Sequence, residues 1–256
     1  MSRVRKALRI AVPVLALAAV GAGAYFGLKW YRTVPLERVI VAGNVHADPA
    51  RIEELAALDT VSFVFDANPE VVAARVKRHP WVRDVDVTRW PTGTLEIEVH
   101  ERTPVMLALD ASGRPRYYID ADGYRMPLVQ GAFHNVPLLR GVQSSEGVGE
   151  PTKDPRVRAL ASDLAELGEE ELAIASEFDV RGREVWLRTA TTLGGQSIEV
   201  RLGRGGFGEK MRRLHAFWHQ AVLTQPDTHF ELVDLRFDSQ IVTREAAAGN
   251  AGTRSN

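Results

Sequence analysis

The sequence contains no cysteine, which excludes disulfide bonds, thiolate catalysis and cysteine-ligated metal sites. It also has almost no net charge, since 32 Lys and Arg residues balance 33 Asp and Glu residues. We therefore expect no general electrostatic attraction to nucleic acid or to an anionic membrane surface. Apolar residues make up 45% of the chain and charged residues 25%. This ordinary globular composition predicts that most of the 256 residues fold.

Charged side chains are also missing from residues 10–28. As a helix rising about 1.5 Å per residue, this stretch would reach roughly 28 Å, close to the hydrocarbon thickness of a bilayer. More basic residues flank its N-terminal side than its C-terminal side, which places the N-terminus inside the cell. These basic residues are Arg3, Arg5, Lys6 and Arg9 before the stretch and Lys29 and Arg32 after it. The sequence predicts a cytoplasmic tail over 1–9, one transmembrane helix over 10–28, and the remainder outside the cytoplasm.

An alternative interpretation of the same segment is a cleaved signal peptide. Ala22-Gly23-Ala24 resembles a signal-peptidase site behind a basic N-terminal region. The apolar run continues beyond that site to a length that suits an anchor better than a signal peptide. Both interpretations place the rest of the chain outside the cytoplasm.

The first exported module has the pattern of a small α/β unit. Residues 36–41 are rich in β-branched side chains and predict a strand. Asp48-Pro49 and Asn68-Pro69 are helix-start signals, each with an N-cap residue followed by proline. Two further strands are predicted, one ending at Trp90 and one alternating over 95–100. The order is strand, helix, helix, strand, strand over residues 34–103.

Short strands separated by turns dominate the sequence from Pro104 onward. Two segments, 156–168 and 209–223, have the amphipathic period of helices. The last strands are expected over 230–237 and 240–244, followed by a small, polar tail over 245–256 that we expect to be disordered. The fold class is therefore α+β, with a second domain over 104–244 that combines many strands with two packed helices.

One glycine motif has the spacing of a dinucleotide-binding loop. Gly203, Gly205 and Gly208 follow a predicted strand and open a predicted helix. The preceding strand alternates polar and apolar residues, whereas a central strand of a nucleotide-binding fold is continuously apolar. We therefore interpret the motif as a flexible, basic connecting loop.

Two other groups of residues suggest metal binding only superficially. His215 and His219 share a helix face, but a third ligand is not apparent and Ala216 stands where a zinc protease has its glutamate. We expect both histidines to face solvent. Asp120 and Asp122 lack the spacing of a calcium loop. The sequence thus predicts no catalytic residue, no cofactor and no metal, although an envelope enzyme with an unrecognised site stays open as an alternative.

Several segments, taken in order, resemble the FtsQ/DivIB family of bacterial cell-division proteins, most closely its FtsQ type. The resemblance covers almost the whole chain. After the basic tail and apolar span, the segments that carry it are Val39–Asn44, His79–Val85, Arg89–Pro91, Leu95–Val105, Ile119–Gly123, Val136–Gly141, Val200–Gly203 with Lys210, and Val233–Phe237.

The resemblance implies a POTRA domain over 34–103 and the family's mostly antiparallel β domain over 104–244. It implies a non-catalytic scaffold that binds FtsB and FtsL outside the cytoplasm and helps recruit and regulate septal peptidoglycan synthesis. It also implies a single-pass protein of the inner membrane, enriched at the septum, whose POTRA domain could contact other division proteins. A POTRA-type chaperone of envelope assembly is an alternative, but the strands of an associated membrane barrel are not apparent after residue 104.

In the FtsQ type, a strand of the partner adds to the last strand of the β domain. The corresponding partner-binding residues here are Arg236, Phe237, Ser239, Gln240, Ile241, Val242 and Thr243. A terminal strand is a candidate open edge that offers unpaired N–H and C=O groups to an extended peptide. The residues alone leave open that this strand is interior and already paired. Gln240 departs from the family, where a small residue often follows the serine.

Overall fold

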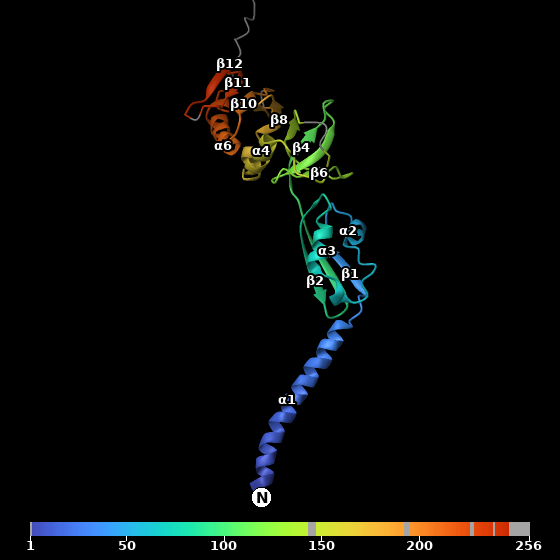
Figure 1. Cartoon of the computed structure of the whole chain (residues 1–256). Coiled ribbons are helices and arrows are strands. Elements are labelled where there is room, and N and C mark those ends of the chain that lie inside the picture. The colour runs from blue at the N-terminus through green and yellow to red at the C-terminus, as the bar shows by residue number, and fades with distance from the viewer. Residues whose placement is uncertain (1, 143–146, 192–194, 226–227, 238, 246–256) are drawn as a thin grey trace, which may run out of the picture. The chain divides into compact units, whose positions relative to one another are not determined.

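The computed structural model describes residues 2–142, 147–191, 195–225, 228–237 and 239–245, with side chains from Pro13 onward (Figure 1). Contacts divide the chain into two compact units, Met1–Glu101 and Arg102–Asn256. The tail predicted over 245–256 lies outside the described residues except for Glu245, which belongs to a strand.

Helix α1 (Ser2–Arg32) opens the first unit and takes in both the predicted tail and the predicted span. Its segment Pro13–Arg32 has a mean hydropathy of 1.3, and no part of its most apolar stretch is buried. Lys29 and Arg32 lie in the last turn, where cations interact favourably with the carboxyl end of a helix. By length and composition, this helix can cross a membrane.

A three-stranded sheet with two helices follows α1 in the first unit. The strands lie in the order β1-β3-β2, with β1 parallel and β2 antiparallel to the central β3. The observed order of strand, helix, helix, strand, strand confirms the predicted βααββ pattern. The elements are β1 (Arg38–Ala42), α2 (Pro49–Ala56), the 3-10 helix η1 (Val64–Asp66), α3 (Pro69–Val76), β2 (Val82–Trp90) and β3 (Thr94–Glu101).

Local sequence explains where these elements begin and which faces they bury. The side chain of Asp48 accepts a hydrogen bond from the N–H of Ala50, and that of Asn68 accepts one from Glu70, so both predicted caps are present. Strand β3 alternates buried Leu95, Ile97 and Val99 with more exposed residues. These apolar side chains and those of α2 and α3 form the core of the unit: Ile52, Ala56, Val72 and Val76.

One nine-stranded sheet organises the second unit, in the order β12-β11-β10-β9-β8-β7-β4-β5-β6. Its pairs are antiparallel except for β4–β7, β7–β8 and β10–β11, which confirms a mostly antiparallel domain. The strands are β4 (Pro104–Leu109), β5 (Pro115–Asp120), β6 (Arg125–Pro127), β7 (Leu138–Arg140), β8 (Ala175–Arg181), β9 (Glu184–Thr189), β10 (Glu199–Gly203), β11 (Phe230–Asp234) and β12 (Val242–Glu245).

Helices α4 (Pro155–Ala165) and α6 (Phe207–Phe217) pack together and share one hydrophobic core with the strands (Figure 1). A short helix, α5 (Glu169–Leu172), was not expected from the sequence. Helix α6 also does not run regularly to residue 223, because its last turn is the π-helix η2 (Trp218–Val222). Its first and last residues, Trp218 and Val222, are both buried.

Candidate functional site

The two edges of the nine-stranded sheet differ in how they are protected. At the β6 edge, the backbone of Arg125 bonds to the segment beyond it, accepting from Gly149 N and donating to Glu150 O. At the other edge, β12 pairs only with β11 among the described residues, and all four of its residues are exposed. An unprotected edge strand is a template for pairing with another chain. The sheet therefore has one covered edge and one candidate docking edge.

The hydrogen-bond pattern shows which backbone groups β12 offers to a partner. Leu235 N donates to Arg201 O in the parallel pairing of β11 with β10, so odd-numbered residues of β11 bond toward β10. Asp234 consequently bonds toward β12, opposite Val242. By alternation, the N–H and C=O of Thr243 point away from β11, toward the open side.

The seven residues carried over from the family do not all lie in this strand. Only Val242 and Thr243 belong to β12, whereas the other five lie in the connection from β11: Arg236, Phe237, Ser239, Gln240 and Ile241. The strand expected over 240–244 thus begins two residues later, and the strand expected over 230–237 ends at Asp234.

Side-chain hydrogen bonds explain these strand boundaries. After β11, Arg236 turns back so that its N–H and its guanidinium both donate to the Asp234 carboxylate, at 2.7–3.1 Å. Before β12, the carbonyls of Phe237 and Gln240 accept from Arg213 of α6. Groups bonded in this way are not available for a β ladder. The connection is consequently a loop held by side-chain hydrogen bonds. The side chain of Phe237 on this loop is 43% exposed.

The Asp234–Arg236 pair gives the edge a defined pH dependence. Hydrogen bonds from Arg236 lower the pKa of Asp234 from its usual 3.8, although burial acts in the opposite direction. A pKa lowered in the folded state stabilises the fold above pH 3.8, and this stabilisation is lost as pH falls through the lower folded value. We expect the destabilisation caused by Asp234→Asn, measured by denaturant unfolding, to be largest near neutral pH and to shrink as the pH falls below 3.8.

Glu231→Gln is the matched control for this prediction, because Glu231 is an exposed carboxylate of the same strand. Its effect on the free energy of unfolding should stay within about 0.5 kcal/mol at every pH. If the Asp234→Asn effect were equally large in acid and at neutral pH, the ionised carboxylate would not be the source of the stabilisation.

The glycine-rich segment after β10 leads into the N-terminus of α6, where a backbone N–H is already bonded to a side chain of the same chain. Gly206 has a φ of 63° and precedes α6. The N–H of Gly208 donates to the carboxylate of Asp163 at 3.1 Å, where a bound phosphate would otherwise accept. Lys210 donates to the carbonyls of Leu202 and Gly205. The loop that was expected to be flexible is therefore held at both ends.

The structure shows the burial and the contacts of the residues that resembled metal ligands. His219 is exposed as expected, but His215 is only partly exposed, and its Nε2 is buried without a hydrogen-bond partner. The two rings lie 4.5 Å apart, and the described residues include no group of three possible ligands. Asp120 is buried, accepts the N–H groups of Asp122 and Tyr124, and pairs with Arg102 at 2.7 Å. Its carboxylate therefore stabilises the turn after β5.

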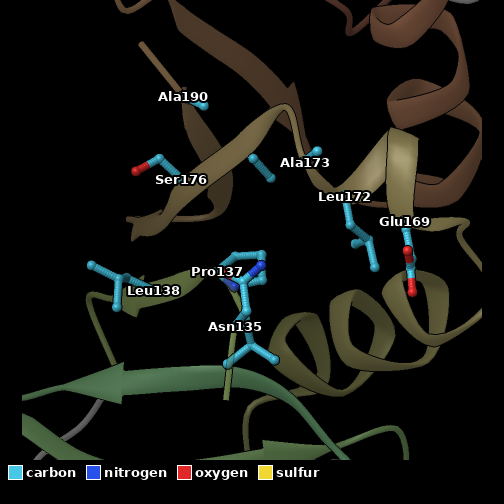
Figure 2. A pocket seen from close by; sticks show the side chains of 10 residues that line it. Asn135, Pro137, Leu138, Glu169, Leu172, Ala173, Ser176 and Ala190 are labelled. Carbon is cyan, nitrogen blue, oxygen red and sulfur yellow. The ribbon is translucent and has the colours of Figure 1, made fainter. Parts of the chain in front are cut away.

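A cavity of about 760 Å³ lies between the segment that precedes β7, helix α5 and the start of β8 (Figure 2). Its lining includes one carboxylate, Glu169 on α5, and one hydroxyl, Ser176 on β8. Histidine, lysine and arginine are not among the lining residues.

A βααββ unit that follows a helix able to cross a membrane and precedes a sheet with one candidate docking edge is typical of a POTRA-domain protein. The family model "POTRA domain, FtsQ-type" matches residues 34–102, and the model "FtsQ/DivIB, C-terminal related" matches residues 103–244. The chain belongs to the FtsQ family of cell division proteins.

Relatives named cell division protein FtsQ match along almost the entire chain. The protein from Rhodothermus marinus is 48% identical over 247 residues, which cover 96% of this chain and 88% of the relative. That from Salinibacter ruber is 38% identical and covers 94% of each chain. The similarity thus extends through both units and the N-terminal helix.

Proposed function

We propose that this chain is a non-catalytic, bitopic scaffold of the bacterial divisome. In this role it binds FtsB and FtsL outside the cytoplasm and helps to recruit and regulate septal peptidoglycan synthesis. Membership of the FtsQ family supports a role in cell division. The open edge at β12 is the observation that carries the proposed mode of binding.

The N-terminal helix would anchor the protein in the inner membrane, with the N-terminus in the cytoplasm and both units in the periplasm. The segment Pro13–Arg32 has the required length and hydropathy. The cluster of basic residues before the apolar run supports this orientation. Enrichment at the septum would follow from binding to other division proteins, which the POTRA domain could also contact.

In the proposed complex, a strand of the partner lies beside β12 and extends the sheet by one strand. The N–H and C=O of Thr243 would bond to the main chain of the partner, which supplies affinity with little dependence on sequence. Selectivity would come from side chains at the edge and on the connection next to it. These are Arg236, Phe237, Ser239, Gln240, Ile241, Val242 and Thr243.

The test is direct binding between the full chain, reconstituted in lipid nanodiscs, and a purified FtsB–FtsL complex from the same organism. We expect saturable binding with a dissociation constant in the micromolar range or tighter, as for specific protein interfaces. Empty nanodiscs are the control for lipid binding. Absence of binding at about ten micromolar complex would contradict the proposed function and direct attention back to the cavity beside α5.

A further inference from the structure

The edge strand β12 is short and depends on the segment that leads into it. It has four residues, it is exposed along its length, and its register with β11 shifts between Phe230 and Leu232. Such a strand gains little from side-chain burial, so its order depends on its backbone partners. The described residues of the connection from β11, 235–237 and 239–241, lead directly into β12 and add to the contacts that hold it.

A hydrogen bond from α6 fixes the second half of this connection. The Nη2 atom of Arg213 lies 2.9 Å from the carbonyl oxygen of Phe237 and 3.0 Å from that of Gln240. One guanidinium thus bridges two carbonyl groups on either side of the turn that contains Ser239. The donor lies more than twenty residues away in sequence, on a helix whose other face is part of the core.

The first half of the connection is held by contacts that do not involve α6. Arg236 forks onto Asp234 two residues earlier, and Leu235 N donates to Arg201 O. Between this anchor and β12, Arg213 bonds to Phe237 and Gln240, and Ile241 packs against the core. Loss of the Arg213 side chain would remove the hydrogen bonds that connect the carbonyls of Phe237 and Gln240 to α6.

We propose that Arg213 is a positioning residue for partner recognition: by bridging the carbonyls of Phe237 and Gln240, it orders β12 in the conformation that accepts a partner strand. This inference rests on the proposed function. A partner that binds only the ordered edge loses affinity in proportion to the fraction of molecules in which the edge is ordered. Arg213 would act on that fraction and would not itself contact the partner.

Arg213→Met removes the donors and keeps most of the aliphatic stem. We expect the association rate with FtsB–FtsL to fall about tenfold and the dissociation rate to stay nearly unchanged, because fewer molecules present an ordered edge. Arg213→Lys, which keeps a single charged donor group, should give an intermediate association rate. Arg212→Met is the matched control, since Arg212 is an exposed neighbour on the same helix whose nearest carboxylate, Glu171, is 3.9 Å away.

Hydrogen exchange of the full chain in nanodiscs, without any partner, tests the positioning role separately. In Arg213→Met, peptides covering 235–245 should exchange about tenfold faster, while peptides of α4 and β9 and the melting temperature stay unchanged. Arg212→Met should exchange like the wild type. Should the melting temperature fall in Arg213→Met, the same comparison is made with Arg213→Lys.

The outcomes separate the inference from the proposed function. If hydrogen exchange over 235–245 were unchanged in Arg213→Met, the positioning role would be overturned, regardless of the binding results. Faster exchange with an unchanged association rate would show that order at the edge does not govern recognition, which also overturns it. If the wild type itself does not bind FtsB–FtsL, the proposed function fails, even where Arg213 orders the edge.

Discussion

Replacement of Thr243 by proline is expected to weaken binding to FtsB–FtsL about a hundredfold without unfolding the domain. The N–H of Thr243 points away from β11, so its loss costs no hydrogen bond within the sheet. Proline is tolerated on an edge strand when its missing donor would have faced solvent. In the complex, however, a main-chain carbonyl of the partner strand would lose the N–H donor of residue 243 and would meet the proline ring at the same point.

Val242→Pro provides a comparison within the same strand. The N–H of Val242 faces Asp234 in β11, so proline at this position removes a hydrogen bond of the sheet itself. We expect Val242→Pro to loosen β12 in the free protein, seen as faster hydrogen exchange over 242–245. In contrast, Thr243→Pro should leave hydrogen exchange over 242–245 slow and weaken only the binding to FtsB–FtsL.

Binding to FtsB–FtsL, measured for the full chain in nanodiscs, checks the prediction, with Thr243→Val as the control for loss of the hydroxyl. The valine variant should bind within about threefold of the wild type, because it keeps the backbone donor and favours a strand. If Thr243→Pro bound as tightly as the wild type, the partner would not add to this edge.

Removal of the Glu101 side chain is expected to have the largest effect on the stability of the first unit, a loss of about 3 kcal/mol in Glu101→Ala. Glu101 ends β3, and its Oε1 accepts the N–H groups of Val45, His46 and Ala47, each at 2.8 Å. His46 Nδ1 lies 2.8 Å from Oε2. Alanine would leave three backbone donors of the β1–α2 loop without their acceptor.

The ionisation of Glu101 makes this effect depend on pH. Burial raises the pKa of Glu101, but the hydrogen bonds from Ala47, Val45 and His46 together outweigh it and lower the pKa below the usual 4.5. The carboxylate thus stabilises the fold above pH 4.5, and this contribution disappears as pH falls through the lower folded value. The destabilisation caused by Glu101→Ala should accordingly be smaller in acid than at neutral pH.

Denaturant unfolding of the full chain, followed by the tryptophans, measures this change. Glu98→Ala is the control, because Glu98 is an exposed carboxylate on the same strand, and it should cost about 0.5 kcal/mol or less. Equal costs for the two variants would show that the carboxylate does not hold the 45–47 loop as described.

Local patterns predicted most of the elements because the signals act between residues close in sequence. Asp48-Pro49 and Asn68-Pro69 marked two helix starts, and the structure shows both caps. The alternation of 95–100 and the amphipathic period of 209–223 predicted which side chains are buried. The same reasoning missed helix α5 and the π-helical turn η2, because neither has a distinctive local signal.

The sequence indicated a candidate site but not its geometry. The resemblance to the FtsQ type indicated residues 236, 237 and 239–243, of which only Val242 and Thr243 lie in the exposed edge strand β12. Nothing local shows that the strand begins at Val242, because Arg213, far away in sequence, takes the carbonyls of Phe237 and Gln240. The sequence likewise indicated nothing of the Asp163 carboxylate that closes the glycine-rich helix start.

The family of the chain was indicated by its resemblance to FtsQ/DivIB segments. By itself, then, the sequence determined the apolar span, most of the elements and their buried faces. These depend on hydropathy, periodicity and capping, which are properties of neighbouring residues. Only the tertiary structure decided which strand forms the open edge and that Thr243, not Val242, turns its backbone groups outward. Those features depend on strand pairing and on hydrogen bonds between distant segments, which no local pattern encodes.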